Sequence, residues 1–180
     1  MISAYHFRQV QNIPKDVYLD TNFVFSFVVK PSKSKKDDYQ LHRNAERLIK
    51  RLVAKKININ ISLLVLNEIW FILAGYFYDL ANGKGAWESE ANKGSICKKF
   101  SSKLKIATEK LFKIPRLKLI PTKNHEKIAK DALNNIKNYS LLPADALHIS
   151  IAQSEKIPCI ITNDKHFRQI HDPNLIIITF

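Results

Sequence analysis

Residues 56–74 read KININISLLVLNEIWFILA and contain two periodicities in succession. Over residues 57–61, three isoleucines alternate with two asparagines, a pattern that predicts a half-buried strand. The apolar run that follows is long enough for a core helix, and Ser62 stands where an N-cap residue is expected. The stretch therefore predicts a strand that leads directly into a helix.

The same alternation of strand and helix continues along the chain. We expect further strands at 16–20, 117–120, 158–162 and 175–180, and helices or helical turns at 21–29, 37–54, 124–138, 143–155 and 165–170. Asp37 or Asp38 is expected to cap the helix at 37–54. This order favours an α/β fold with a mainly parallel sheet and helices on both faces. In such sheets, ligands bind beyond the carboxyl ends of the strands, where the strand order reverses.

The length of 180 residues suits one domain with a sizeable core. We expect an irregular arm at residues 1–15 and a single domain at residues 16–180. A break at Asn82-Gly83-Lys84-Gly85 precedes a basic stretch, so a basic helical elaboration is expected around residues 81–113. The 29 basic and 16 acidic side chains give a formal net charge of +13, which favours a polyanionic partner. A solubilising surface is the alternative.

The location of the protein is predicted from its cysteines and its apolar segments. Cys97 and Cys159 fit neither a metal-binding spacing nor a disulfide framework, and the N-terminus lacks a signal-peptide pattern, so a cytoplasmic protein is expected. Residues 62–80 approach the length of a membrane span, but Asn67, Glu68 and Asp79 weigh against insertion. We therefore expect no membrane association.

Glu68 is the only acid in the otherwise apolar stretch 63–74. A buried, ionised carboxylate costs several kcal/mol unless it is paired, neutralised or bound to a metal. Glu68 lies too far inside the predicted helix to act as a cap. It therefore predicts either a functional site or, as the alternative, a buried salt bridge to a lysine.

Three other acids interrupt apolar segments: Asp20, Asp145 and Asp164. Each has an ordinary explanation when taken alone, because Asp20 and Asp164 could cap the elements that follow and Asp145 could stabilise the first turn of a helix. Together with Glu68, however, they fall at carboxyl ends of strands or on helices that leave the same edge. Such a cluster of carboxylates is repulsive without a cation, and oxygen ligands select Mg²⁺ or Mn²⁺. The absence of a His/Cys cluster at ligand spacing weighs against zinc.

Four short blocks carry a resemblance to a known family: Leu19-Asp20-Thr21-Asn22, Leu66-Asn67-Glu68-Ile69, Ala144-Asp145-Ala146-Leu147-His148-Ile149 and Thr162-Asn163-Asp164-Lys165-His166-Phe167. In order, spacing and context they resemble PIN-domain ribonucleases, most closely VapC-type toxins of toxin–antitoxin modules, from about residue 16 to residue 180. The resemblance implies a three-layer α/β/α sandwich and metal-binding roles for Asp20, Glu68, Asp145 and Asp164. It also implies an RNA substrate and a small antitoxin partner. The arm and the 81–113 segment depart from the compact toxins.

The expected chemistry is hydrolysis of a phosphodiester bond by water that divalent ions activate. The resemblance implies products with 5′-phosphate and 3′-hydroxyl ends. Thr21, Asn22, Thr162 and Asn163 could orient the carboxylates, or act only as turn and cap residues. His148 shares a helix face with Asp145 and is expected to be a satisfied core or orienting histidine. His166 is expected on a helix surface.

RNA contacts are expected from lysines and arginines that bind phosphates with little sequence discrimination. The candidates are Lys33, Lys35, Lys36, Arg43, Arg47, Arg51, Lys98, Lys99 and Lys103. A solvated surface charge is the alternative for each of them. Apolar residues such as Trp70 and Tyr76 could belong to the core, to a homodimer interface or to an antitoxin surface.

The same residues leave other functions to be distinguished. A catalytically inactive PIN-like module that binds RNA or protein is one alternative, and a PIN-like nuclease acting in RNA processing or on DNA is another. A haloacid-dehalogenase phosphatase needs an Asp where Asn22 stands, and a receiver domain needs an acidic pair near its first strand, from which Asp16 is too distant.

Overall fold

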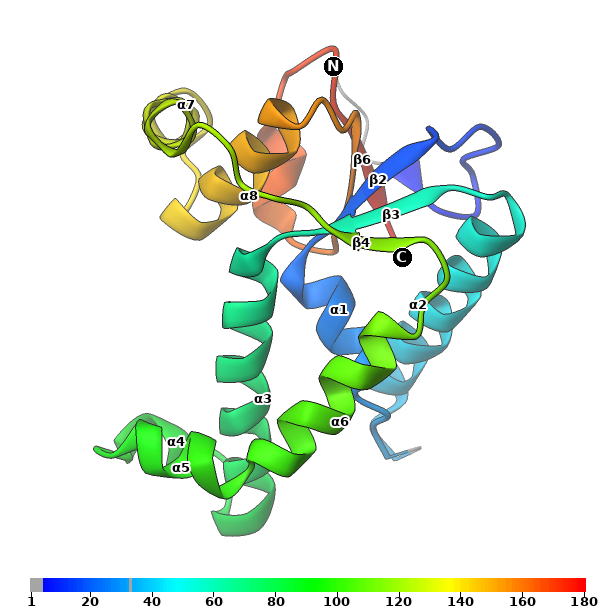
Figure 1. Ribbon diagram of the computed structural model, residues 1–180. Helices are drawn as coiled ribbons and strands as arrows, with labels where there is room; N and C mark the ends of the chain where they lie inside the picture. Colours follow the sequence, from blue (N-terminus) through cyan, green and yellow to red (C-terminus); the bar gives the residue numbers. More distant parts are fainter. Residues whose placement is uncertain (1–4, 33) are drawn as a thin grey trace.

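A computed structural model describes residues 5–32 and 34–180, so Lys33 lies outside the described part of the chain (Figure 1). Its six-stranded sheet has the order β1-β6-β5-β2-β3-β4, and every neighbouring pair is parallel. The strands are β1 (Tyr5–His6), β2 (Asp16–Leu19), β3 (Asn58–Ile61), β4 (Leu117–Leu119), β5 (Cys159–Ile161) and β6 (Ile176–Thr179). The predicted α/β fold with a parallel central sheet is confirmed.

Helices connect the strands and cover the sheet. They are α1 (Thr21–Val28), α2 (Lys36–Ala54), α3 (Leu63–Asn82), α4 (Ala86–Ser89), α5 (Lys93–Lys99), α6 (Ser101–Phe112), α7 (His125–Tyr139), α8 (Pro143–Ser154) and the 3₁₀ turn η1 (Lys165–Gln169). Figure 1 shows α7 and α8 on one side of the sheet and α1, α2 and α6 on the other. From β2 the chain builds outward to β3 and β4, and later returns to form β5 and β6 on the other side of β2. The strand order therefore reverses between β2 and β5, where a ligand site is expected.

The prediction of a half-buried strand at 57–61 is wrong in one respect, because both faces of β3 are covered. Ile59 and Ile61 are fully buried, and Asn60, on the opposite face, is only 4% exposed. The Asn60 side chain donates a hydrogen bond from Nδ2 to the carbonyl oxygen of Val17, at 3.1 Å. A polar residue is accepted in this central strand because its amide is hydrogen-bonded.

The expected irregular arm also differs from the structure. Tyr5–His6 form β1, which adds to the edge of the sheet beside β6, and Phe7 is buried in the core. A two-residue strand has no periodicity that a sequence could display. In α2 the helix begins at Lys36, so Asp37 and Asp38 lie in its first turn rather than at its cap.

The segment after α3 folds back along it. The Asp79 carboxylate accepts the backbone N–H groups of Gly85 and Trp87, which fixes the reversal into α4. Gly75 is required for this packing, because a Cβ there would lie 2.9 Å from the Trp87 ring. Figure 1 shows α4, α5 and the start of α6 projecting from the sheet beside the far end of α3.

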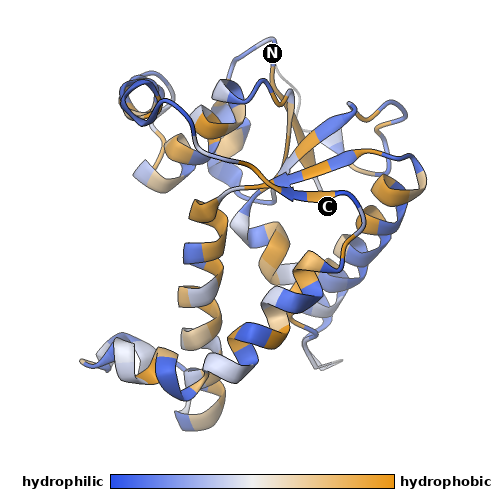
Figure 2. Ribbon diagram, in the orientation of Figure 1, coloured by the Kyte–Doolittle hydropathy of each residue, from blue (hydrophilic) through white to orange (hydrophobic). Residues whose placement is uncertain are grey.

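Helix α3 is long and apolar enough to cross a membrane by length and composition alone. Figure 2 shows that it is apolar along most of its length. Val65, Leu66, Ile69 and Leu73 are buried in the core, and α3 packs against α1 and α6. These contacts place one face of α3 in the core, while Trp70, Phe71 and Ile72 remain exposed.

Candidate active site

Four acidic side chains from four different elements line one cavity of about 400 Å³. Asp20 follows β2, and Asp164 lies in the loop that follows β5, the neighbour of β2. Glu68 lies in the second turn of α3, and Asp145 lies in the first turn of α8. The structure thus brings together all four acids that the sequence singled out, at the carboxyl edge of the sheet.

Thr162 organises the ends of β2 and β5. Its buried hydroxyl donates to Asp20 Oδ2 at 2.8 Å. Thr162 Oγ1 itself accepts hydrogen bonds from Asn22 Nδ2 at 3.0 Å and from the backbone N–H of Asp164 at 2.9 Å. A single hydroxyl therefore sets the positions of two of the four acids.

Asn163 extends this network to the last residue of the chain. Its N–H donates to Asn22 Oδ1 at 3.2 Å, and its side-chain amide exchanges two hydrogen bonds with the backbone of Phe180. Thr21 and Asn22 line the cavity, whereas Thr162 and Asn163 support it from behind. All four residues contact the acidic cluster or its loops.

Glu68 is held by a buried polar network. Glu68 Oε2 accepts hydrogen bonds from Thr21 Oγ1 and, at 2.8 Å, from His148 Nε2. The buried His148 also lies 3.4 Å from Asp20 Oδ1 through the same nitrogen. Its other nitrogen, Nδ1, is 2.9 Å from the Tyr18 hydroxyl, which in turn is 2.7 Å from Ser62 Oγ. Within the described residues the partner of Glu68 is therefore a histidine, not one of the lysines.

The other two acids meet at the mouth of the cavity. His166 Nδ1 lies 3.2 Å from Asp145 Oδ2 and 3.3 Å from Asp164 Oδ1. Asp164 Oδ1 also accepts the backbone N–H of His166 at 2.8 Å, which caps η1. His166 is exposed on the short helix η1, as expected, and in addition its imidazole is directed at two carboxylates.

The protein shifts the pKa values of these acids in different directions. Burial raises the pKa of Asp20, and burial together with the charge of Asp164 raises the pKa of Asp145. Burial also acts to raise the pKa of Glu68, but the hydrogen bonds from His148 and Thr21 and the charge of His148 outweigh it and lower that pKa. Burial opposes protonation of His148, yet Glu68 and Asp20 raise its pKa above the ordinary value. The contact with Glu68 and Asp20 thus favours the protonated form of His148, and the contact with His148 favours the ionised form of Glu68.

The donor set fits a divalent cation. One oxygen each from Asp145 and Asp164 and one nitrogen of His166 lie within 4.8 Å of one another. Asp20 and Glu68 line the same cavity, and carboxylate oxygens are the preferred ligands of Mg²⁺ and Mn²⁺. A cation among these groups would offset the repulsion that raises the pKa of Asp145.

The predicted RNA-binding side chains lie outside this cavity. Lys35, Lys36, Arg43 and Arg47 are exposed at the start and along the outer face of α2, and Lys98, Lys99 and Lys103 are exposed on α5 and α6. Lys103 Nζ lies 4.7 Å from the centre of the Phe77 ring. Arg51 differs from the others, because its guanidinium donates to the carbonyl oxygens of Phe7 and Val10 and ties the N-terminal segment to α2. This role is structural.

Sequence reasoning missed Tyr18, Ser62 and His166 as parts of the polar network. Tyr18 and Ser62 read as a strand residue and a helix cap, and Ser62 does accept the N–H of Val65 at 3.5 Å. The only available signal for His166 was its place two residues after Asp164.

Comparisons with known proteins agree with this fold. No curated protein matches the chain. Among solved structures, a chain in the crystal structure of VapBC2 from Rickettsia felis bound to a DNA fragment from their promoter matches with a TM-score of 0.50 and 21% sequence identity. The match covers 91% of this chain and 98% of that chain, and at this identity it concerns the fold. The PIN domain family matches residues 17–173, which is most of the sequence, and the chain therefore belongs to that family.

Proposed function

We propose that this protein is a metal-dependent endoribonuclease that hydrolyses phosphodiester bonds in RNA. The observation that carries the proposal is the convergence of Asp20, Glu68, Asp145 and Asp164 on one cavity of a PIN-domain fold. A formal net charge of +13 around this acidic cavity suits a polyanionic substrate. A nuclease acting on DNA and an inactive binding module are the alternatives.

In this proposal the four carboxylates hold Mg²⁺ or Mn²⁺. When bound, such an ion lowers the pKa of water and stabilises the negative charge that develops on the phosphate. Thr162 fixes Asp20 and the backbone of Asp164, while Thr21 and His148 fix Glu68. These contacts hold the carboxylates at defined positions before substrate arrives, which is the condition for electrostatic catalysis.

The exposed cations on α5 and α6, Lys98, Lys99 and Lys103, would bind the RNA backbone. Lys35, Lys36, Arg43 and Arg47 would extend this surface along α2. The two groups of cations lie on or beside different helices of the molecule (Figure 1). Substitution of each group in turn measures its contribution to RNA binding.

The deciding experiment is cleavage of total cellular RNA with Mg²⁺, with Mn²⁺ and with a chelator. Asp20→Asn should abolish cleavage, while Asp37→Asn, an exposed acid in the first turn of α2, should leave it unchanged. Binding of RNA without cleavage under any metal would support the inactive module, and preferential cleavage of single-stranded DNA would support the DNA nuclease.

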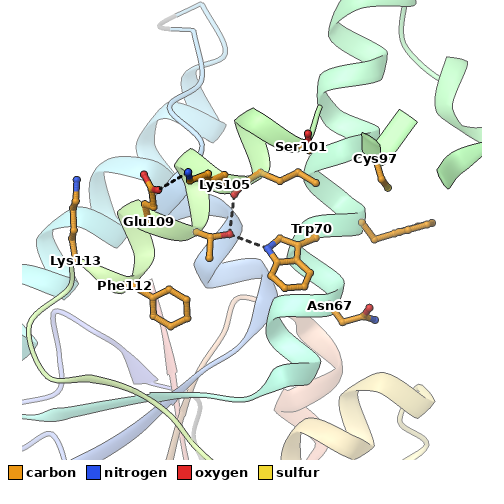
Figure 3. Close-up of a pocket in the computed structure, with 11 residues that line it drawn as sticks. Asn67, Trp70, Cys97, Ser101, Lys105, Glu109, Phe112 and Lys113 are labelled. Carbon is orange, nitrogen blue, oxygen red and sulfur yellow. Dashed lines mark hydrogen bonds and ion pairs between the residues drawn. The ribbon is translucent and has the colours of Figure 1, made fainter. Parts of the chain in front are cut away.

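We further propose that the protein is the cytoplasmic toxin of a type II toxin–antitoxin pair. The R. felis VapBC2 chain shares its fold, which supports a small antitoxin partner. Helices α3 and α6 form a groove of about 740 Å³ that shares Asn67 and Phe71 with the acidic cavity (Figure 3). Such a groove would seat an antitoxin segment beside the catalytic carboxylates.

The lining of this groove indicates the chemistry of the segment. Trp70, Phe71 and Phe112 supply exposed apolar surface, and the Trp70 indole is fixed by a hydrogen bond to Thr108 Oγ1 at 2.9 Å. Lys105, Glu109 and Lys113 are the charged lining residues, and Lys105 already lies 3.8 Å from Glu109. An apolar segment with an acid near Lys113 would therefore complement the groove.

Coexpression with the product of a short neighbouring reading frame tests this partner. The proposal expects a stable complex that Phe112→Asp disrupts while RNA cleavage by the free protein persists. A second copy of this chain is the competing occupant of the groove. A Phe112→Asp protein that changes from dimer to monomer, with antitoxin binding intact, would assign the groove to a homodimer instead.

A further inference from the structure

We propose that His166 is a metal ligand, and that Asp145, Asp164 and His166 Nδ1 together bind a first-row transition dication such as Mn²⁺ in preference to Mg²⁺. This inference rests on the proposed metal-dependent function. It adds a nitrogen donor to a site that the sequence described as built from oxygen alone.

The first argument is geometric. His166 Nδ1 is 3.2 Å from Asp145 Oδ2 and 3.3 Å from Asp164 Oδ1. Adjacent ligands around a six-coordinate ion with bonds near 2.1 Å are separated by about 3 Å. The imidazole nitrogen therefore already has the spacing of a neighbouring ligand to each carboxylate oxygen, and all three donors lie within 4.8 Å of one another.

The second argument concerns how the imidazole is held. The backbone N–H of His166 donates to Asp164 Oδ1, so the 3₁₀ turn that carries the ring also fixes the carboxylate beside it. The His166 side chain is 47% exposed at the cavity mouth, while those of Asp145 and Asp164 are 13% and 32% exposed. An ion entering from solvent would thus meet all three donors without rearrangement of the core.

His148 provides the contrast. Both of its ring nitrogens have protein partners, Tyr18 on one side and Glu68 on the other, and its side chain is 2% exposed. It is placed to orient a carboxylate and not to bind an ion. His166 has Nδ1 directed at two carboxylates and an exposed ring, so the two histidines of the site serve different purposes.

The nitrogen donor has a consequence for metal choice. Mg²⁺ favours oxygen ligands, whereas imidazole binds first-row transition ions well, and affinity for such donors rises from Mn²⁺ towards Cu²⁺. Replacing the imidazole with an oxygen donor should therefore reduce the preference for Mn²⁺ and leave Mg²⁺ binding largely intact.

The test is pulsed electron paramagnetic resonance and calorimetry on the full-length protein, with Mn²⁺ and Mg²⁺ as the probes. Wild type should show a directly coordinated nitrogen on Mn²⁺, and His166→Gln should lose that signal. The Mn²⁺ dissociation constant should rise roughly tenfold in His166→Gln, by analogy with the effect of losing a supporting ligand contact. His171→Gln, which changes an exposed histidine in the segment before β6, is the matched control and should behave as wild type.

A His166→Gln protein that keeps both the nitrogen signal and the Mn²⁺ affinity of wild type would overturn the inference. Metal-dependent RNA cleavage by that protein would leave the proposed function standing. Conversely, loss of the nitrogen signal in His166→Gln with no RNA cleavage by wild type would support the ligand and reject the ribonuclease.

Discussion

Tyr18→Phe should destabilise the protein through the polar network behind the acidic cavity. Tyr18 is fully buried in β2, and its hydroxyl lies 2.7 Å from Ser62 Oγ and 2.9 Å from His148 Nδ1. Phenylalanine keeps the ring and its packing, so the substitution removes only the oxygen that joins the two groups. Ser62 and His148 then each lose a buried partner.

The expected cost follows from the partners that remain. Ser62 Oγ keeps the N–H of Val65 and His148 Nε2 keeps Glu68, but His148 Nδ1 loses its hydrogen-bond partner. Leaving a buried polar group with an unmet partner costs about 1–3 kcal/mol. For a chain of this size, each kcal/mol lowers the thermal midpoint by about 2–4 °C. RNA cleavage should also slow, because His148 orients Glu68.

Urea unfolding at neutral pH in a chelator measures this loss. Tyr139→Phe is the matched control, since Tyr139 is half-buried on α7 and its hydroxyl makes no hydrogen bond within the described residues. If Tyr18→Phe and Tyr139→Phe both stay within about 0.5 kcal/mol of wild type, the network does not support the site as reasoned.

Three further predictions address the acids and the basic surface. Glu68→Gln should lower the rate of RNA cleavage by about tenfold to a hundredfold, because it removes a carboxylate. The fold should be retained by circular dichroism, since glutamine keeps a side chain that Thr21 and His148 can contact. An unchanged cleavage rate would show that Glu68 does not belong to the site. Asp145→Asn should not reduce stability in a chelator, because burial and the charge of Asp164 raise the pKa of Asp145 and its ionised form weakens the folded state. Since that pKa lies above the unfolded value, wild type should lose stability as pH rises from the ordinary aspartate pKa through the raised one. The free energy of unfolding, measured with urea at several pH values, should fall less steeply with pH for Asp145→Asn. Arg51→Ala should lower the free energy of unfolding by about 1.5–3 kcal/mol without a matching loss of RNA binding, whereas the exposed Arg47→Ala should leave stability unchanged.

The meeting of the four acids could be predicted from the sequence because it depends on topology. Asp20 and Asp164 follow strands that end at the same edge, and Glu68 and Asp145 lie on helices that begin there. Parallel strands connected by helices bring such positions together whatever the details of packing. Convergence of this kind needs only the order of the elements.

Features that depend on the direction of one side chain could not be predicted in this way. Tyr18 has the pattern of an ordinary core residue, and nothing in the sequence places its hydroxyl between Ser62 and His148. The basic residues show the same limit, because Lys110 is one of many lysines in its segment. In the structure its Nζ donates to the carbonyl oxygen of Phe27 at 2.7 Å, near the C-terminal end of α1, and burial lowers its pKa. Part of the positive charge therefore stabilises the fold.

The two halves of the acidic cavity differ in what they need from a cation. Glu68 already accepts a hydrogen bond from His148 inside the protein, and its pKa is lowered. Asp145 faces Asp164 at the cavity mouth, and its pKa is raised by burial and by that second carboxylate. His166 offsets this repulsion only in part, because the pKa of Asp145 remains raised, so a divalent ion should occupy the outer pair first. Metal titrations of Asp164→Asn should consequently lose the tighter binding event, whereas those of Glu68→Gln should retain it.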